Sequence, residues 1–477
     1  MLGKQTTTKT QSQKGKWAWW SKAEEEEAKT HDTHGKTKHF RFVVRSHAHT
    51  HTYTHTMGSE LSKLEVGSRE EAAANISRLL EQCEHVGEDL RSKLMHILES
   101  NCEEKVDLCN SKLGNVGAAA LAKALVFNRN LRVLRLRANA FGPDGAESLA
   151  GALAQHTSIG EVDLSGNAIG AEGARAVAAA LALAPRPRLL ALDLHGNSIG
   201  TEGAKGLACP SGGAAQSGPS PLASLASLDL GWNEIDDAGA KAIATAIAPS
   251  QTLVRLNLSH NPIFQKGAKY IAKAIAMVTT LKSLELAHCT VGDQGAMALA
   301  IALKSSESSV QRIDLSSNSI HSRGGKALAD VLGSDCSLER LNLKRNMLDD
   351  EAAEAIAAAL QRNSRLTHLD LSRNNLGHRG GSALLASLHT NRVLRQLFYA
   401  CDALEKSVAF ARDLAGVHYK RPAIHVPRMR YDKKKTCWHK KRVDIHTHTH
   451  THTRVRQRPL FGFFPFVWSG NHNPCSG

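Results

Sequence analysis

The sequence predicts an α/β solenoid of horseshoe shape, with parallel strands on the concave face and helices on the convex face. Three observations support this fold class. A segment of about 28 residues recurs through the middle of the chain, its first part alternates apolar and polar residues, and its second part has apolar residues at helical spacing. About ten to eleven such units fill residues 103–402, so we expect one solenoid flanked by caps and disordered tails.

Residues 1–56 form a low-complexity basic tail that we expect to be disordered. Its alternating His and Thr, "SHAHTHTYTHT", recurs near the other end as "IHTHTHTHTR". Such tracts can bind metal through imidazole, but a flexible array has no preset geometry and no surrounding shell to orient the rings. A DNA run of alternating C and A encodes the same two residues. We therefore favour translated microsatellite and predict no metal site.

Residues 57–63, "MGSELSK", suggest a second possible start of the chain. If translation begins at Met57, Gly58 fits the pattern for N-myristoylation. Membrane contact is expected only in that case, because neither end resembles a signal peptide and "LFGFFPFVW" is too short to span a bilayer. Nine cysteines without a C-x-x-C pair fit a reducing compartment. We expect a soluble cytoplasmic protein, with the nucleus as the alternative suggested by "KKKTCWHKKR".

Residues 57–102 are expected to cap the first unit with helices. "SREEAAANISRLLEQ" and "GEDLRSKLMHILES" are amphipathic, and Ser68 with Glu71 forms a capping-box pattern. A solenoid needs such covers because its end units expose apolar surface. Residues 403–420 are expected to serve the far end, followed by a second basic His-Thr tail at 421–477 that we expect to be disordered.

Each unit contains L-x-x-L-x-L-x-x-N, and we index the units by the residue that closes this pattern. The index residues are Ser111, Asn139, Asn167, Asn197, Asn233, Asn261, Cys289, Asn318, Asn346 and Asn374, with a degenerate eleventh unit ending at Asp402. An asparagine at each bend can satisfy backbone groups that the turn leaves unpaired. The insertion "CPSGGAAQSGPSP", residues 209–221, is predicted to be a flexible surface loop that shortens the helix of the fourth unit.

Helices follow the strands in every unit, with Leu, Val or Ile ten residues past the index. Nine of the ten units have glycine six past the index, and the tenth has Ala352. Because glycine is unfavourable in helices, its recurrence predicts a close approach to the neighbouring backbone. Strands lie about 4.8 Å apart, whereas helices need about 8–10 Å, so the stack must curve with its strands inside.

The complete unit, extended by I-G-x-x-G-A-x-x-L-A-x-x-L, resembles the ribonuclease-inhibitor class of leucine-rich repeats. Ribonuclease inhibitor, the sensing domains of NOD-like receptors and Ran GTPase-activating protein share this pattern. The resemblance implies a non-enzymatic scaffold or regulator that binds a protein on its concave face. The alternatives are a GTPase activator that acts on a small GTPase and an innate-immune sensor fragment. The chain lacks the acidic tail of the activator family, and no catalytic residue is carried over.

Polar side chains on the concave face are the candidates for partner binding. The outward strand position between the last two leucines of the pattern is mostly acidic, and the candidates there are Asp163, Asp193, Asp229, Glu285, Asp314 and Asp370. Several cations and one aromatic residue differ from the usual sequence of the repeat: Arg132, Arg135, Arg137, Trp232, Arg312, Arg340 and Lys344. Arg and Trp are enriched at binding hot spots. The competing interpretation is that the acidic residues are simply usual at this position of the repeat.

Charge and motifs exclude other classes of function. The chain has a formal charge of +15, but residues 101–400 carry 30 Lys and Arg against 26 Asp and Glu. The folded part is therefore near neutral, which argues against specific nucleic-acid binding. No phosphate-binding loop, nucleophile elbow or zincin helix is present. We predict a monomeric protein without cofactor, metal or catalytic residues.

Overall fold

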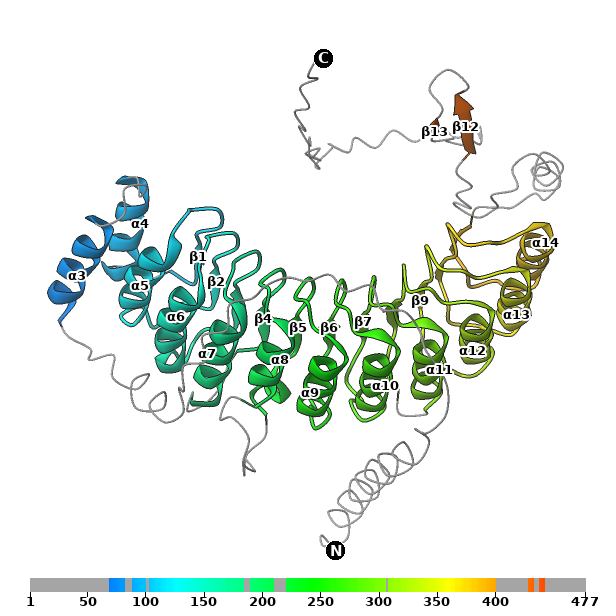
Figure 1. Ribbon diagram of the computed structural model, residues 1–477, viewed down its shortest axis with the longest axis horizontal. Helices are drawn as coiled ribbons and strands as arrows, with labels where there is room; N and C mark the ends of the chain where they lie inside the picture. Colours follow the sequence, from blue (N-terminus) through cyan, green and yellow to red (C-terminus); the bar gives the residue numbers. More distant parts are fainter. Residues whose placement is uncertain are drawn as a thin grey trace, which may run out of the picture. The chain divides into compact units, whose positions relative to one another are not determined.

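The computed structural model describes residues 68–81, 88–99, 103–183, 189–209, 220–305, 308–399, 428–432 and 437–441. Eleven of its strands form one parallel sheet in chain order (Figure 1). They are β1 Lys105–Asp107, β2 Val133–Arg135, β3 Glu161–Asp163, β4 Ala191–Asp193, β5 Ser227–Asp229, β6 Arg255–Asn257, β7 Ser283–Glu285, β8 Arg312–Asp314, β9 Arg340–Asn342, β10 His368–Asp370 and β11 Gln396–Phe398. The predicted solenoid with one strand per unit is confirmed.

The strands pair in strict register, so each residue lies beside its counterpart in the next unit. Val106 pairs with Leu134, and Leu134 with Val162. The central residue of each strand from β1 to β11 is buried against the helices, and its two neighbours lie on the concave side. Equivalent side chains therefore form columns that run across the concave face.

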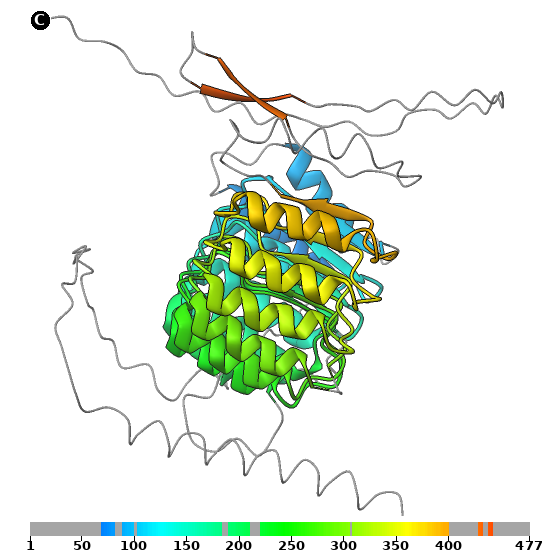
Figure 2. The same cartoon turned by 90° about the vertical axis from the view of Figure 1, so that its right-hand side faces the viewer.

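Helices cover the outer side of the curve, one after each of the first ten strands (Figures 1 and 2). They are α5 Gly114–Leu125, α6 Pro143–Gln155, α7 Gly170–Leu183, α8 Gly200–Ala208, α9 Asp237–Ile247, α10 Phe264–Ile275, α11 Gly292–Leu303, α12 Ser322–Leu332, α13 Asp350–Leu360 and α14 His378–Ser387. Alternating leucines from strands and helices meet in a continuous core, with Leu134, Leu149 and Leu164 fully buried. Strands inside and helices outside confirm the expected curvature.

The recurring glycine marks a close contact between neighbouring helices. A Cβ atom on Gly267 would lie 2.5 Å from Ile263 Cγ2, 3.0 Å from Ala240 Cβ and 3.1 Å from Asp237 Cα. Two of these atoms belong to the preceding helix α9. A side chain here would push adjacent units apart.

We expect Gly267→Ala to lower the free energy of unfolding by about 1–2 kcal/mol, because overpacking exceeds the gain in helix propensity. Urea denaturation of the full chain measures the change. Gly333→Ala is the matched control, because the nearest atom to its Cβ would be Arg362 Nη2 at 3.3 Å, the mobile end of a side chain. Equal stability of the Gly267 variant and the native chain would contradict the close-approach explanation.

The index asparagines form a buried ladder between units. Asn261 Nδ2 donates to the carbonyls of Leu230 and Leu258, both at 2.8 Å. Its Oδ1 accepts from the backbone N–H groups of Asn233 and Ile235, both at 3.0 Å. The predicted satisfaction of backbone groups is confirmed, and the bonds to Leu230, Asn233 and Ile235 also join one unit to the next.

Cys289 is the exception within this ladder. Its thiol Sγ lies 3.2 Å from the Leu258 carbonyl and so keeps part of the donor role. The preceding unit lacks the usual side-chain acceptor, and Ile263 N–H bonds the Asn261 carbonyl at 2.8 Å instead. The polar link between these two units is therefore weaker than at the Asn261 position itself.

Two helices precede the sheet where the sequence predicts the N-terminal cap: α3 Arg69–Glu81 and α4 Glu88–Glu99. The capping box is confirmed, because Ser68 N–H donates to Glu71 Oε2 at 3.1 Å and Glu71 N–H to Ser68 Oγ at 3.2 Å. Both helices contact α5, and Ile76 and Leu94 are fully buried.

The insertion shortens the helix of its unit as predicted, since α8 has 9 residues. The chain resumes at Ser220, whose side chain caps the 3-10 turn η1 Pro221–Ser224. Residues 210–219, the tail 1–56, Gly58, Asp402 and the expected cap 403–420 lie outside the described residues.

Within the C-terminal tail, for which we expected disorder, the structure contains an antiparallel strand pair, β12 Arg428–Asp432 and β13 Cys437–Lys441. The sequences "RMRYD" and "CWHKK" place aromatic residues among cations, which favours extended backbone more than the average tail composition suggests. The remainder of the tail, including the His-Thr tract, lies outside the described residues.

Candidate functional site

The residue before each index position has left-handed backbone. Its φ is positive in all ten units: Asn110, Ala138, Gly166, Gly196, Trp232, His260, His288, Ser317, Arg345 and Arg373. Residues other than glycine rarely adopt this backbone conformation. The turn is held by bonds between units, since Trp232 N–H donates to the Ser259 carbonyl at 2.9 Å and His260 N–H to the Ala287 carbonyl at 2.7 Å.

This repeated turn places three ring side chains on top of one another. The rings of Trp232 and His260 are stacked with centroids 3.9 Å apart, and those of His260 and His288 with centroids 4.2 Å apart. We call Trp232, His260 and His288 the aromatic stack. Trp232 is 54% exposed, so the stack presents a large aromatic surface to solvent. Burial, followed by the nearby His288 and His195, lowers the pKa of His260, which favours the neutral form of its ring.

Sequence reasoning selected Trp232 and missed both histidines of the stack. The available signal was the spacing, because Trp232, His260 and His288 follow one another at intervals of 28 residues. Identical positions in consecutive units become neighbours once the strands pair in register. His195, from the preceding unit, lies farther off, with its ring centroid 6.5 Å from that of Trp232.

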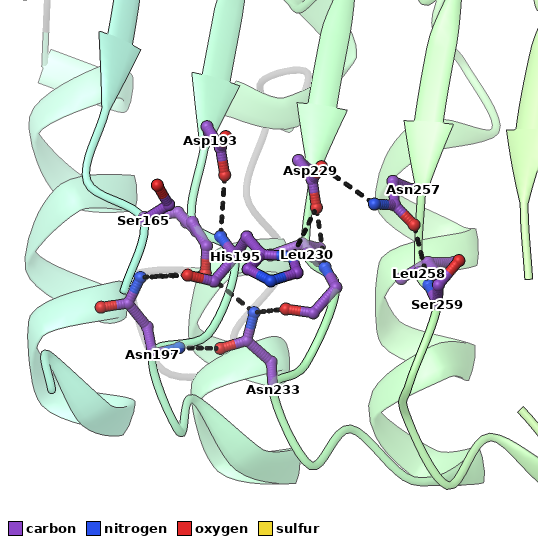
Figure 3. Close-up of polar contacts among 12 residues, drawn as sticks. Ser165, Asp193, His195, Asn197, Asp229, Leu230, Asn233, Asn257, Leu258 and Ser259 are labelled. Atoms are coloured by element: carbon purple, nitrogen blue, oxygen red, sulfur yellow. Dashed lines mark hydrogen bonds and ion pairs between the residues drawn. The ribbon is translucent and has the colours of Figure 1, made fainter. Parts of the chain in front are cut away.

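The acidic column has a structural role that sequence reasoning did not identify. Most of its carboxylates accept the backbone N–H two residues further on, which ends the strand (Figure 3). The distances to Oδ1 are 2.9 Å for Asp163, Asp193 and Asp229, and 2.8 Å for Asp314 and Asp370. A side chain with this geometry is needed here whether or not a partner binds.

Two asparagines replace aspartate in the column and link its members. Asn257 Oδ1 accepts from Ser259 N–H at 2.9 Å, while its Nδ2 donates to Asp229 Oδ2 at 2.9 Å (Figure 3). Asn342 likewise donates to Asp314 Oδ2 at 2.8 Å. The amide thus satisfies the strand end and also removes one negative charge from a crowded row.

Glu285 departs from this arrangement. Its longer side chain does not receive the local backbone bond, and Ala287 N–H donates instead to Ser259 Oγ at 3.1 Å. The residue is exposed on the concave face, where partial desolvation and then the charges of Asp229 and Asp314 raise the pKa of its carboxyl. Among the acidic candidates, Glu285 is therefore better placed to contact a partner than the strand-ending aspartates.

Asp193 has the most perturbed carboxyl in the column. Burial raises its pKa to about 6, and the negative charges of Asp229 and Asp163 act in the same direction. The backbone N–H of His195 and the charge of its ring partly oppose this shift. A fraction of Asp193 is consequently protonated at neutral pH.

The candidate cations fall into two separate groups. Arg132, Arg135 and Arg137 lie on or beside β2, whereas Arg312, Arg340 and Lys344 lie on or after β8 and β9, with β3 to β7 between them. Arg135 Nη2 is 3.0 Å from Glu161 Oε1, and Arg132 Nε is 3.7 Å from Glu104 Oε1. The sheet does not bring the two groups together. Trp232, Asp229 and Glu285 lie between them.

Metal and thiol chemistry receive no support from the described side chains. In that part of the chain no group of three or more His, Cys, Asp or Glu residues is arranged to hold a metal ion. Cys109, Cys209, Cys289 and Cys336 are free cysteines. Burial raises the pKa of the Cys289 thiol to about 12, so this residue is an unreactive structural cysteine.

The repeat pattern agrees with a known family. A sequence model of the leucine-rich repeat family matches nine segments, at 127–150, 155–178, 188–208, 222–244, 250–272, 279–300, 308–329, 334–357 and 362–385. The chain is a leucine-rich repeat protein. A comparison of this leucine-rich repeat protein with curated protein sequences gives no match.

Solved structures similar to this leucine-rich repeat protein include the tropomodulin C-terminal domain of Caenorhabditis elegans, with 16% identity, coverage of 29% of this chain and 84% of that chain, and a TM-score of 0.25. Leiomodin-1 actin-binding site 2 has 21% identity, coverage of 32% and 73%, and a TM-score of 0.21. A TLR13–ssRNA13 complex has 20% identity, coverage of 58% and 40%, and a TM-score of 0.32.

None of the helices in the described part of this leucine-rich repeat protein has both the length and the apolar character needed to cross a bilayer.

Proposed function

We propose that this leucine-rich repeat protein is a non-enzymatic scaffold or regulator that binds a protein partner on its concave face. The aromatic stack is the observation that carries this proposal. Aromatic side chains are enriched at the centres of protein interfaces, and Trp is among the commonest hot-spot residues. Trp232 is held by stacking rather than buried, so its surface stays available although its position is fixed. A pre-positioned ring costs a partner little side-chain entropy on binding.

The polar surroundings fit a protein partner. Glu285 ends β7, the strand that precedes His288, and His195 lies in the turn after β4. His195 Nδ1 lies 3.7 Å from Asp229 Oδ1 (Figure 3). An aromatic centre bordered by hydrogen-bonding and charged groups is the usual anatomy of a protein interface. No described residue singles out GTPase activation or innate-immune sensing, and those two alternatives stay hypotheses.

Site-specific photo-cross-linking tests the proposal in cells that express the full chain. A photoreactive phenylalanine replaces Ser283, which lies on the concave face in β7, or Gln294, which is exposed on α11. We expect a protein adduct from position 283 and none from position 294. Adducts of equal yield at both positions, or none at 283, would overturn the concave-face proposal.

We expect Trp232→Ala to reduce the yield of the adduct at position 283 by at least about tenfold, because truncating a central aromatic hot spot costs roughly 2 kcal/mol or more. Ile301→Ala is the matched control: Ile301 is 73% exposed on α11, outside the concave face. Thermal unfolding of both variants checks that they remain folded. An unchanged adduct in the Trp232 variant would remove the aromatic stack from the interface.

A further inference from the structure

A row of three arginines and one histidine crosses the second half of the concave face. Arg255, Arg312, Arg340 and His368 occupy the first position of β6, β8, β9 and β10, and we call these four residues the cationic row. Arg312 pairs in register with Arg340, and Arg340 with His368. Paired strands lie about 4.8 Å apart, and like charges directly opposite one another destabilise a sheet.

The cationic row lacks the acidic partners that cations have in the first half of the sheet. Lys105 lies 3.8 Å from Asp107, and Arg135 lies 3.0 Å from Glu161. In contrast, no carboxylate of the described residues lies within ion-pair distance of Arg255, Arg312 or Arg340, and all three are exposed. Arg312 and Arg340 therefore lie side by side without an ion-pair partner among the described residues, while Arg255 interacts at longer range with Glu285.

The side chains of the row lie close enough to influence one another electrostatically. Burial lowers the pKa of His368, and the next causes are the positive charges of Arg340, Arg395 and Arg312, so His368 favours its neutral form and the arginines supply the positive charge. Arg395, one residue before β11, thus extends the positive field beyond the row itself. An anion placed here would interact favourably with several cations at once.

We propose that the cationic row binds an acidic segment of the protein partner, rich in Asp or Glu. This inference rests on the proposed function, because it specifies which chemistry the concave face recognises. Arginine forks bind carboxylates through paired hydrogen bonds, and the long side chains of Arg312 and Arg340 can adapt to residues about 6.6–7 Å apart on one side of an extended segment.

A nucleic acid fits the same surface less well. Asp314 and Asp370 lie two residues after Arg312 and His368 on the same strands, roughly 6.6 Å away along the sheet. A phosphate backbone carries a charge on every nucleotide and would also face these carboxylates. A polypeptide can instead direct its carboxylates toward the cationic row and neutral or basic groups toward the acidic column.

Fluorescence anisotropy with the full chain tests the inference. The probe is a fluorescein-labelled decapeptide of alternating Glu and Ala, compared with a Lys-Ala decapeptide and a ten-nucleotide oligothymidine of the same label. We expect the Glu-Ala peptide to bind most tightly, and its affinity to fall with salt because the contacts are exposed. Arg312→Ala combined with Arg340→Ala is expected to weaken this binding at least about tenfold.

The matched control combines Arg323→Ala with Arg362→Ala. Both arginines are exposed, on α12 and after α13 respectively, and the control removes the same net charge. We expect it to change binding by less than about twofold, since distant exposed charges are largely screened. Thermal unfolding should show that neither double variant is less stable than the native chain by more than a few degrees.

Three results would overturn the inference: no binding of the Glu-Ala peptide, equal weakening by both double variants, or tighter binding of oligothymidine. Photo-cross-linking at position 283 separates this failure from that of the proposed function. If the adduct persists and depends on Trp232 while the peptide does not bind, only the acidic-segment inference falls. If peptide binding depends on the row but no adduct forms at 283, the concave-face proposal fails and the anion site stands.

Discussion

Asn261→Ala is expected to lower the free energy of unfolding by about 4 kcal/mol. Four strong hydrogen bonds are lost, two donated by Nδ2 to carbonyls and two accepted by Oδ1 from backbone N–H groups, all between 2.8 and 3.0 Å. Asn261 is 1% exposed, so water does not replace its side chain easily. Each buried polar group left without a partner costs about 1–3 kcal/mol. Urea denaturation and amide hydrogen exchange of the full chain measure the loss.

Two further variants test the hydrogen-bond explanation of this loss. Asn375→Ala removes the same side chain from an exposed position and should change stability by less than about 0.5 kcal/mol. Asn261→Cys copies the residue at 289, whose thiol still approaches a carbonyl, and should cost less than Asn261→Ala. If the cysteine and alanine variants were equally unstable, the hydrogen bonds that this side chain donates to carbonyls would contribute nothing measurable to the free energy of unfolding.

Asp193→Asn is expected to stabilise the folded chain by about 2 kcal/mol at pH 7. The raised pKa of Asp193, about 6 against the ordinary 3.8, means that the folded state holds this proton more tightly than the unfolded state. Its contribution to stability is therefore complete below pH 3.8 and is lost as pH rises through 6. The amide removes this loss, and it can still accept the His195 N–H as Asn257 accepts that of Ser259.

Urea denaturation at several pH values between 4 and 7 measures this effect. The difference in unfolding free energy between variant and native chain should grow with pH across that window. Asn257→Asp is the reciprocal test, because it restores a carboxylate beside Asp229 and removes the bond to its Oδ2. We expect this variant to be less stable than the native chain at pH 7. If the difference in unfolding free energy between Asp193→Asn and the native chain did not vary with pH, the link between stability and the raised pKa of Asp193 would be refuted.

The repeat spacing was sufficient to predict the fold. Residues 28 apart repeat the same apolar pattern, and register pairing such as Leu134 with Val162 follows once each unit forms one strand. The role of Asn261 was also predictable, because a short side chain with donors and an acceptor suits a buried bend. The fold and the asparagine ladder were predictable because the residues that form them recur at the same positions in nearly every unit.

The candidate site was predictable only in part. Trp232 and the acidic column were identified from their residue types, but the backbone conformation that creates the aromatic stack was not. A positive φ usually favours glycine, and Trp232 and His260 gave no such signal. Hydrogen bonds between units impose the conformation, and a single repeat viewed alone does not contain them. The strand-ending bond of Asp193 was missed for a different reason, because it lies within one repeat and depends on local geometry rather than on composition.

The cysteine at position 289 has a consequence for how the array comes apart. In a solenoid each unit is coupled only to its neighbours, so cooperativity fails first at the weakest junction. The junction of the units containing Asn261 and Cys289 lacks the usual side-chain acceptor, yet the rings of His260 and His288 stack across it. A partner bound to the aromatic stack would contact both units and stabilise their junction. Binding there would make the two parts of the array unfold as one.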